Sequence, residues 1–319
     1  MIFEFLYAGL GLIILLLAGD VLVKGAVNLS LRLGIPALIV SLTIVAFGTS
    51  APELLISIKA VMDGVPGLAL GNVVGSNTAN VLLILGVPAL IFGLAAGSDT
   101  RRTYLFMIGG SLLFTLLAFT GPFTWLSGLV LLGVLGAILF DAARAAQAHR
   151  RAANGAPAPE EEEILDEADP DMPWWKIGLY LALGLIGLPL GADLLVDSSV
   201  AIAQAYGVSD TVIGLTLVAV GTSLPELATT VMAAIRNHAD VALGNVIGSN
   251  MFNLLAIIGI SAFVGEIPVD DAFLSFDLWV MLGASLILAP FVYLRWSLGR
   301  GFGVVFTALY AGYIALLLQ

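Results

Sequence analysis

The 319-residue sequence contains no cysteine and only two histidines, and only 11% of its residues are charged. Without cysteine, disulfides and thiolate metal sites are excluded. With 60% hydrophobic residues, its apolar surface exceeds what the core of one soluble domain could bury. The net charge of −11 comes mostly from one hydrophilic segment and does not indicate a nucleic-acid partner. The composition therefore predicts an integral membrane protein.

Apolar runs of about 20 residues, the length of a helix that crosses a bilayer, recur along nearly the whole chain. This pattern predicts an all-α membrane protein and leaves no segment for a soluble enzyme domain, so no enzyme activity is expected. Cutting the sequence at polar and turn-rich points gives ten predicted transmembrane helices, at residues 3–23, 37–60, 68–95, 103–120, 124–146, 174–196, 211–235, 241–264, 273–294 and 301–318.

The twelve Lys and Arg residues test this topology, because basic residues favour short cytoplasmic loops. With the N-terminus outside, eleven of the twelve fall at cytoplasmic ends, and only Lys59 falls on the other side. A missed span would invert every later loop, so this distribution supports ten spans. We expect a multi-pass protein of the cell (cytoplasmic) membrane with both termini extracytoplasmic.

The second half of the sequence repeats the first without a change of spacing. GTSAPEL at 48–54 aligns with GTSLPEL at 221–227, and ALGNVVGSNTAN at 69–80 aligns with ALGNVIGSNMFN at 242–253. Nearly half of the positions in 48–80 are identical to those in 221–253, and the alignment needs no gap. Each copy would hold five spans, an odd number, so the two copies must enter the membrane from opposite sides. The sequence thus predicts two inverted five-helix repeats, which are typical of secondary transporters.

A hydrophilic segment at 148–173 separates the two copies and contains Pro, Gly and a dense group of Asp and Glu residues. Such a composition is typical of a flexible, solvated tether. We therefore predict a first five-helix repeat at 1–147, a cytoplasmic acidic linker at 148–173, and an inverted second repeat at 174–319.

A proline followed by a glutamate interrupts the second and seventh predicted spans. Pro52 and Pro225 lack an N–H and clash with the carbonyl four residues earlier, so each helix should break there. Backbone carbonyls freed at mid-membrane must face protein or an aqueous cavity. Glu53 and Glu226 come next, and no span offers a Lys or Arg at comparable depth to pair with them. We interpret the two glutamates as cation ligands in broken helices.

Neutral oxygen donors accompany the glutamates in both copies. GNVVGSN and GNVIGSN begin the following spans and carry asparagines at equivalent places, which close packing of small residues alone does not require. Oxygen donors of this kind suit Ca²⁺ or Na⁺ and do not suit zinc or copper. The predicted set comprises Thr49, Ser50, Glu53, Ser76 and Asn80 with Thr222, Ser223, Glu226, Ser249 and Asn253.

The paired GTSxPE and GNVxGSNxxN elements resemble the two alpha repeats of the Ca²⁺:cation antiporter superfamily, especially its prokaryotic sodium/calcium exchangers. The resemblance covers all ten predicted spans in order, and it implies an antiporter that exchanges Ca²⁺ for Na⁺ by alternating access. It implies inorganic cations and the lipid bilayer as partners, and no cofactor, catalytic residue or obligate protein partner.

The resemblance also implies a role for each residue of the motifs. The implied Ca²⁺ ligands are Glu53, Glu226, Thr49 and Thr222. The implied Na⁺ sites use hydroxyls and carbonyls of Ala46, Thr49, Ser50, Ser76, Ala219, Thr222, Ser223 and Ser249. Asn80 matches an asparagine of the motif.

One position departs from the family pattern, because many sodium/calcium exchangers have an aspartate where this chain has Asn253. With Asn80 also neutral, the site holds at most two carboxylates, which neutralise one Ca²⁺, two Na⁺ or two protons equally well. A Ca²⁺/H⁺ antiporter is therefore the alternative. A cation channel or an intramembrane hydrolase fits less well, because inversion favours alternating access and no nucleophile or histidine pair accompanies the glutamates.

Some further residues stand near the ends of the first spans of the two halves. We interpret Asp20, Asp193 and Asp197 as interfacial end residues and not as gates. Gly187 and Gly191 have GxxxG spacing and predict close packing of the sixth span against another helix.

Overall fold

The computed structural model describes residues 2–94, 100–152, 169, 171–206, 219–271 and 273–317. Within these ranges the secondary structure is helical, with two isolated antiparallel bridges, Leu94 to Leu298 and Phe123 to Ile267. The first half contains α1 (Ile2–Leu33), α2 (Ala37–Val40), η1 (Ser41–Val45), α3 (Ala46–Thr49), α4 (Ala51–Met62), α5 (Pro66–Ala79), η2 (Asn80–Ile84), α6 (Gly86–Ile91), α7 (Arg101–Phe119) and α8 (Trp125–Ala152). The second half contains α9 (Trp174–Ala205), α11 (Ala219–Gly221), α12 (Leu224–Ile235), α13 (Ala239–Met251), η5 (Phe252–Ile257), α14 (Ile258–Val264), η6 (Phe273–Asp277), α15 (Leu278–Leu286), α16 (Ala289–Tyr293) and α17 (Arg300–Leu317). The η elements are π-helical turns.

Eight helices of the described residues are long and apolar enough to cross a membrane, and the bent pair Ala37–Thr49 and Ala51–Met62 adds a ninth if it forms one span. Of the predicted span 211–235, residues 211–218 lie outside the described residues, and α12 covers only 12 residues. The count of ten therefore stays a prediction. Most of the predicted linker, 153–168 with residue 170, also lies outside the described residues.

The predicted spans 3–23 and 174–196 end too early. In the structure α1 continues to Leu33 and α9 continues to Ala205, each as a single helix. No breaker interrupts α1 until Gly34, whose φ of 63° ends the helix. The Gly34 N–H bonds the Leu31 carbonyl at 3.1 Å and the Ile35 N–H bonds the Ser30 carbonyl at 3.0 Å. This pair of bonds forms a Schellman motif, so the chain leaves α1 well after the point that hydropathy alone indicated.

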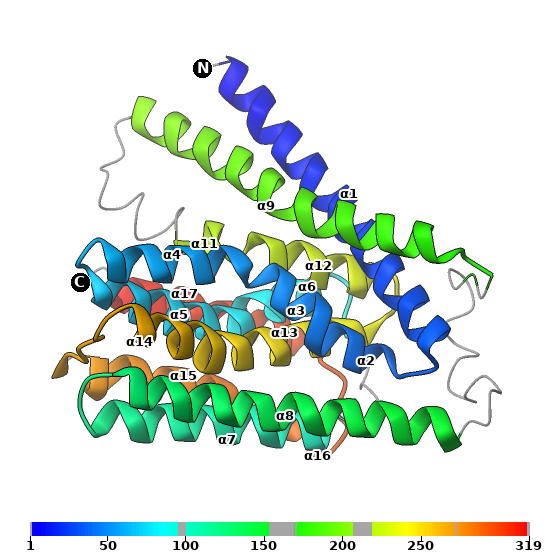
Figure 1. Ribbon diagram of the computed structural model, residues 1–319. Coiled ribbons are helices and arrows are strands. Elements are labelled where there is room, and N and C mark those ends of the chain that lie inside the picture. Colours follow the sequence, from blue (N-terminus) through cyan, green and yellow to red (C-terminus); the bar gives the residue numbers. More distant parts are fainter. Residues whose placement is uncertain are drawn as a thin grey trace.

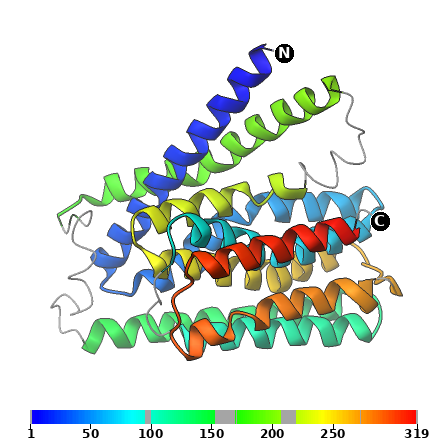
Figure 2. The same cartoon turned by 180° about the vertical axis from the view of Figure 1, so that it is seen from behind.

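The helices α1 and α9 cross each other closely, and both views show them extending away from the other helices near the N-terminus (Figures 1 and 2). Glycines make this approach possible. A Cβ at Gly191 would lie 2.9 Å from the Leu15 backbone N, and a Cβ at Gly184 would lie 2.5 Å from Leu22 Cβ. A Cβ at Gly187 would lie 2.8 Å from that of Ala18. The packing role predicted from the GxxxG spacing is therefore confirmed.

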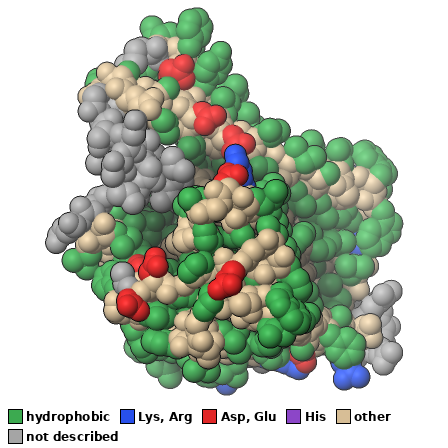
Figure 3. All heavy atoms as spheres, turned by 60° about the vertical axis from the view of Figure 1, so that its left-hand side comes forward, with side chains coloured by type: hydrophobic (Ala, Val, Ile, Leu, Met, Phe, Trp, Pro, Cys, Tyr) green, Lys and Arg blue, Asp and Glu red, His purple; other side chains and the backbone are tan. Residues whose placement is uncertain are grey.

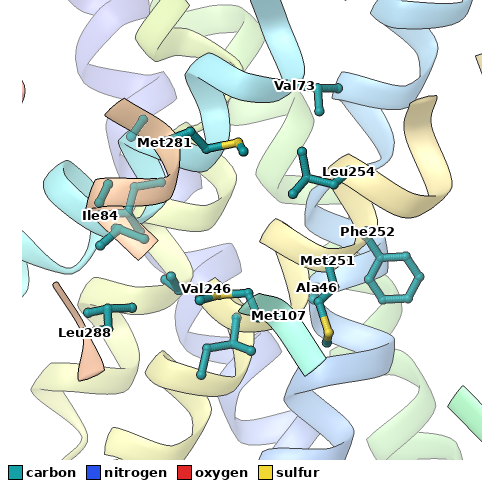
Figure 4. Packing of buried hydrophobic residues seen from close by; sticks show 14 of the residues in the cluster. Ala46, Val73, Ile84, Met107, Val246, Met251, Phe252, Leu254, Met281 and Leu288 are labelled. Atoms are coloured by element: carbon teal, nitrogen blue, oxygen red, sulfur yellow. The ribbon is translucent and has the colours of Figure 1, made fainter. Parts of the chain in front are cut away.

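The helices that carry the repeated motifs occupy the centre of the molecule. In the most apolar 18-residue stretch of Ala239–Val264, 89% of the residues are buried, against 22% in that of Trp174–Ile202. Apolar side chains from α3, α5, α7, α13, η5 and α15 meet around this centre (Figure 4). The face of the molecule seen in Figure 3 is mostly apolar, as expected of a protein embedded in lipid.

Candidate ion-binding site

Two broken helices place the glutamates inside the protein. The backbone departs from helical geometry at Ser50 (φ −85°, ψ 4°) and at Ser223 (φ −91°, ψ 5°), and new helices begin with a proline in their first turn. The first of these breaks bends the chain by 43°. Glu53 and Glu226 follow in the first turns of α4 and α12, where the helix dipole stabilises a negative charge, and each is 1% exposed. The predicted helix breaks are thus confirmed.

An asparagine amide holds the start of each new helix. Asn72 Nδ2 donates to the Glu53 backbone carbonyl at 3.3 Å and to Ser57 Oγ at 3.2 Å. Its counterpart in the second copy of the repeat, Asn245, donates from Nδ2 to the Glu226 carbonyl at 3.4 Å and to Thr230 Oγ1 at 3.3 Å. The same local contact therefore occurs in both halves of the chain and fixes each glutamate against the helix that follows it.

Side chains of the two halves also contact each other at the helix breaks. Ser50 Oγ donates to Glu226 Oε1 at 3.2 Å, and the hydroxyls of Thr49 and Ser249 are also near this carboxylate. Thr49 Oγ1 donates to Asn245 Oδ1 at 3.3 Å and lies 3.5 Å from Ser249 Oγ. The first break therefore supplies hydroxyl groups to the glutamate of the second half.

The asparagines of the second motif meet across the centre. Asn77 Nδ2 donates to the Asn250 carbonyl at 3.1 Å, and Asn250 Nδ2 donates to the Asn77 carbonyl at 3.4 Å. Asn80 Nδ2 donates to Asn250 Oδ1 at 2.9 Å. Asn80 begins η2, which packs against α12, and Asn253 lies in η5, which packs against α4. Each of these two asparagines therefore lies on an element that contacts the glutamate-bearing helix of the other half.

Several buried oxygens in this region have no hydrogen-bond partner among the described residues: Glu53 Oε1 and Oε2, Glu226 Oε2, Asn77 Oδ1, Asn80 Oδ1, Asn253 Oδ1 and Ser223 Oγ. A buried polar atom left unpaired costs about 1–3 kcal/mol, and more when it is charged. The ion pairs of the described residues do not include either glutamate. No described cluster holds three or more His, Cys, Asp or Glu side chains. These oxygens therefore form a donor set with two carboxylates, which fits a hard cation.

The sequence profile of the sodium/calcium exchanger protein family matches residues 3–141 and 176–319, which is most of the chain. The chain belongs to the sodium/calcium exchanger family. Members of this family are transporters, and the resemblance inferred from the paired motifs is confirmed.

Two relatives and one solved structure match this exchanger-family protein over nearly their whole lengths. The inner membrane protein YrbG of Escherichia coli is 34% identical over 311 residues, 96% of this chain and 94% of YrbG. The sodium/calcium exchanger MaX1 of Methanosarcina acetivorans is 35% identical over 348 residues, 98% of each chain. A solved structure of the sodium-calcium exchanger NCX_Mj, soaked with zero Na⁺ and Ca²⁺, has a TM-score of 0.82 and 32% identity over 99% of both chains. The chain is therefore a cation antiporter of the exchanger fold and an integral, multi-pass membrane protein.

The other predicted ligands of this exchanger-family site lie on α3, on α5, on α11 and between α11 and α12. Ser76 is buried in α5, and Thr222 is partly buried between α11 and α12. Ala46 is buried, and its carbonyl accepts bonds from the Ser50 N–H at 3.1 Å and from Thr49 Oγ1 at 3.3 Å. Ala219 is the first residue of α11. Among the predicted hydroxyls, those of Thr49, Ser50 and Ser249 lie near the Glu226 carboxylate. The Ala46 carbonyl is engaged in hydrogen bonds of its own helix.

Sequence reasoning missed the residues that position the glutamates. The asparagines of GNVVGSN and GNVIGSN, which include Asn72 and Asn245, were predicted only as oxygen ligands, and the sequence predicted no role for their partners Ser57 and Thr230. A signal was present, because Ser57 and Thr230 are both hydroxyl residues at equivalent places in the repeat.

Proposed function

We propose that this protein exchanges Ca²⁺ for Na⁺ across the cell membrane by alternating access. The observation that carries the proposal is the group of buried, unpaired oxygens around Glu53 and Glu226, whose two negative charges have no basic partner in the described residues. A desolvated pair of carboxylates is stabilised by a bound cation. MaX1, which is 35% identical, is named a sodium/calcium exchanger.

In this proposal Ca²⁺ binds between Glu53 and Glu226, with Thr49 and Thr222 as further ligands. The Na⁺ ions that replace it use the same glutamates with Ser50, Ser76, Ser223, Ser249 and the carbonyls of Ala46 and Ala219. Asn80 and Asn253 complete the site with neutral amide oxygens. Ca²⁺ and Na⁺ therefore compete, and an empty site keeps two buried carboxylates together, which disfavours the change of state and makes exchange obligatory.

We further propose that 1–147 and 174–319 are inverted five-helix repeats, joined by a cytoplasmic linker and with both termini extracytoplasmic. A twofold relation requires reciprocal contacts between equivalent residues. The bonds between Asn77 and Asn250 are reciprocal in this sense. So are two contacts of α1 with α9, since Gly11 meets Leu195 while Gly184, its counterpart, meets Leu22.

Alternating access then follows from how α1 and α9 are attached. They pack closely on each other and less closely on most of the remaining helices. We propose that this pair moves as a unit over the helix breaks and exposes the glutamates to one side at a time.

Exchange of Ca²⁺ for H⁺ is the second candidate, favoured by the amide at Asn253. Without a third carboxylate, two protons balance the charge of the site as well as two Na⁺ do.

The test uses proteoliposomes loaded with Na⁺ at neutral pH or with acidic buffer, in which uptake of labelled Ca²⁺ is followed. Uptake driven by the Na⁺ gradient and unaffected by a pH gradient is expected, and the opposite result would establish Ca²⁺/H⁺ exchange. Glu53→Gln and Glu226→Gln should each abolish uptake, while Glu266→Gln, at an exposed loop carboxylate, should leave it unchanged. Normal uptake by both site variants would refute the proposed site.

A further inference from the structure

A group of ion pairs joins α1 to α12 at one end of the molecule. Asp20 Oδ1 accepts a bond from Arg236 Nε at 2.9 Å, and Asp20 Oδ2 lies 3.1 Å from Lys24 Nζ. The three side chains are only 16–30% exposed, so the surrounding protein partly shields the pairs from water and salt. Arg236 is the C-cap residue of α12, the helix that carries Glu226 in its first turn. The contact thus connects α1 directly to a glutamate-bearing helix.

The residues at equivalent places in the repeat have different charges. When the two copies are aligned, Asp20 corresponds to Asp193, Lys24 to Asp197, and Arg236 to Asp63. The three residues of the ion-pair group carry one negative and two positive charges, whereas their three counterparts in the repeat are all negatively charged. All three counterparts are exposed and take part in no ion pair among the described residues.

The helix packing has the same asymmetry. α1 lies so close to α12 that a Cβ at Gly19 would be 3.0 Å from the Ala228 carbonyl oxygen, and Ala228 is 6% exposed. The corresponding pair is α9 with α4, which do not pack comparably in the described residues. Leu55, the counterpart of Ala228, is 68% exposed. Among the described residues, α1 therefore packs closely on α12, which we call the closed end, whereas α9 and α4 do not pack comparably, which we call the open end.

Acidic side chains dominate the charge at the open end. Figure 3 turns the end with the N-terminus and the C-terminal part of α9 forward, and it shows several acidic side chains there with few basic ones. Lys59 on α4 is exposed and is the basic residue that the topology places on this side of the membrane. Its counterpart, Met232, packs against Gly19 at the closed end.

We propose that Asp20, Lys24 and Arg236 form an electrostatic latch that holds the carrier closed at the Arg236 end, and that their acidic counterparts leave the opposite end without an equivalent latch. This inference rests on the proposed alternating access. When α9 closes over α4, Asp193 approaches Asp63 and Lys59, and a single lysine faces several carboxylates. The two states of the carrier are therefore unequal in energy, although the repeats are alike. By the distribution of basic residues the Arg236 end is cytoplasmic, so the latch favours the state open to the outside.

Spin labels can measure this bias directly, because the chain contains no cysteine that would be labelled in the background. Cysteines for the labels can replace Tyr206, directly after α9, and Leu68 in α5. The side chains of Tyr206 and Leu68 are 71% and 57% exposed, and neither residue belongs to the latch. Pulsed electron resonance on the double variant in lipid, with saturating Ca²⁺, gives the populations of long and short distances. Transport need not be measured, so failure of the latch is distinct from failure of the Ca²⁺/Na⁺ assignment.

Arg236→Gln should raise the ratio of short to long distances about tenfold, the scale expected for losing a coupled contact of partly shielded charges. Asp20→Asn should act in the same direction, and the two changes together should not add, because they remove one contact. Arg144→Gln on α8 removes the same charge at the same side of the membrane and should leave the distances unchanged. A ratio in Arg236→Gln and Asp20→Asn equal to that of Arg144→Gln would overturn the latch.

The converse variant builds a latch at the open end. Asp63→Arg places a guanidinium opposite Asp193, as Arg236 is opposite Asp20, and should also increase the short distances. Asp63→Asn is the matched control and should have a smaller effect, because it removes repulsion without adding an ion pair. Equal distances in Asp63→Arg and Asp63→Asn would refute the proposal, even if Arg236→Gln failed to fold.

Discussion

Glu53→Gln should reduce the stabilisation of this protein by Ca²⁺ to about a third or less. Both carboxylate oxygens of Glu53 are buried and unpaired in the described structure, so the variant removes a charge that no hydrogen bond compensates. Truncating one partner of a buried charge pair costs about 2–5 kcal/mol, which weakens binding about 30-fold or more. The amide is nearly isosteric, so the helix break and the Asn72 contact to the Glu53 carbonyl are kept.

The magnitude follows from binding linkage. At a Ca²⁺ concentration about 100 times the Kd of the native protein, Ca²⁺ binding raises the free energy of unfolding of that protein by about 2.7 kcal/mol. For a variant that binds about 30-fold more weakly, the free energy of unfolding rises by about 0.9 kcal/mol or less. Without Ca²⁺ the order reverses, because the variant no longer holds two buried carboxylates without a cation. In chelator we therefore expect Glu53→Gln to unfold at a higher temperature than the native protein. Added Ca²⁺ should raise the unfolding temperature of Glu53→Gln by about a third, or less, of the rise seen in the native protein.

Thermal unfolding in detergent, followed with and without Ca²⁺, checks both parts. Glu266→Gln is the control, because it removes one exposed carboxylate and should keep the native response. A full Ca²⁺-dependent rise in unfolding temperature for Glu53→Gln would contradict the assignment of this residue as a Ca²⁺ ligand.

Three further predictions test the surroundings of the site. Ser50→Ala removes the hydrogen bond to Glu226 Oε1. It should weaken Ca²⁺ binding about 10-fold to 150-fold in a calorimetric titration, since bonds to charged groups contribute about 1.5–3 kcal/mol. Asn245→Leu leaves the Glu226 carbonyl without its amide donor and should lower the free energy of unfolding by about 1–3 kcal/mol in denaturant titrations, and an unchanged midpoint would argue against the positioning role. Gly191→Ala puts a methyl group 2.9 Å from the backbone of α1 and should reduce the yield of monodisperse protein on size-exclusion chromatography, whereas Gly178→Ala, where nothing lies within 4 Å, should match the native yield.

Short segments of the sequence predicted the unusual parts of the fold. The prolines at Pro52 and Pro225 determine where the helices break, because loss of an N–H and a ring clash act within four residues. The glutamates that follow were predicted to be cation ligands because a carboxylate at that depth has no basic partner in the sequence. The internal repeat then indicated that the feature is paired. Family membership followed from the same motifs.

Other features of the site depended on helix packing that no local rule describes. The contact of Ser50 with Glu226 joins residues 176 positions apart, and the asparagine pair at Asn77 and Asn250 joins residues 173 positions apart. The sequence also ended α1 and α9 too early, because hydropathy marks the apolar stretch of a helix while hydrogen bonding continues to the next breaker, Gly34 in the case of α1.

The sequence by itself determined that this protein is a duplicated membrane carrier with two carboxylates in broken helices, because composition, proline chemistry and repetition are properties of the chain. Only the tertiary structure decided which of two equivalent ends is closed. Asp20 and its counterpart Asp193 occupy the same place in the repeat, yet one is paired with Arg236 and the other is exposed. This difference arises from contacts between the two halves of the chain, which no local pattern of residues contains.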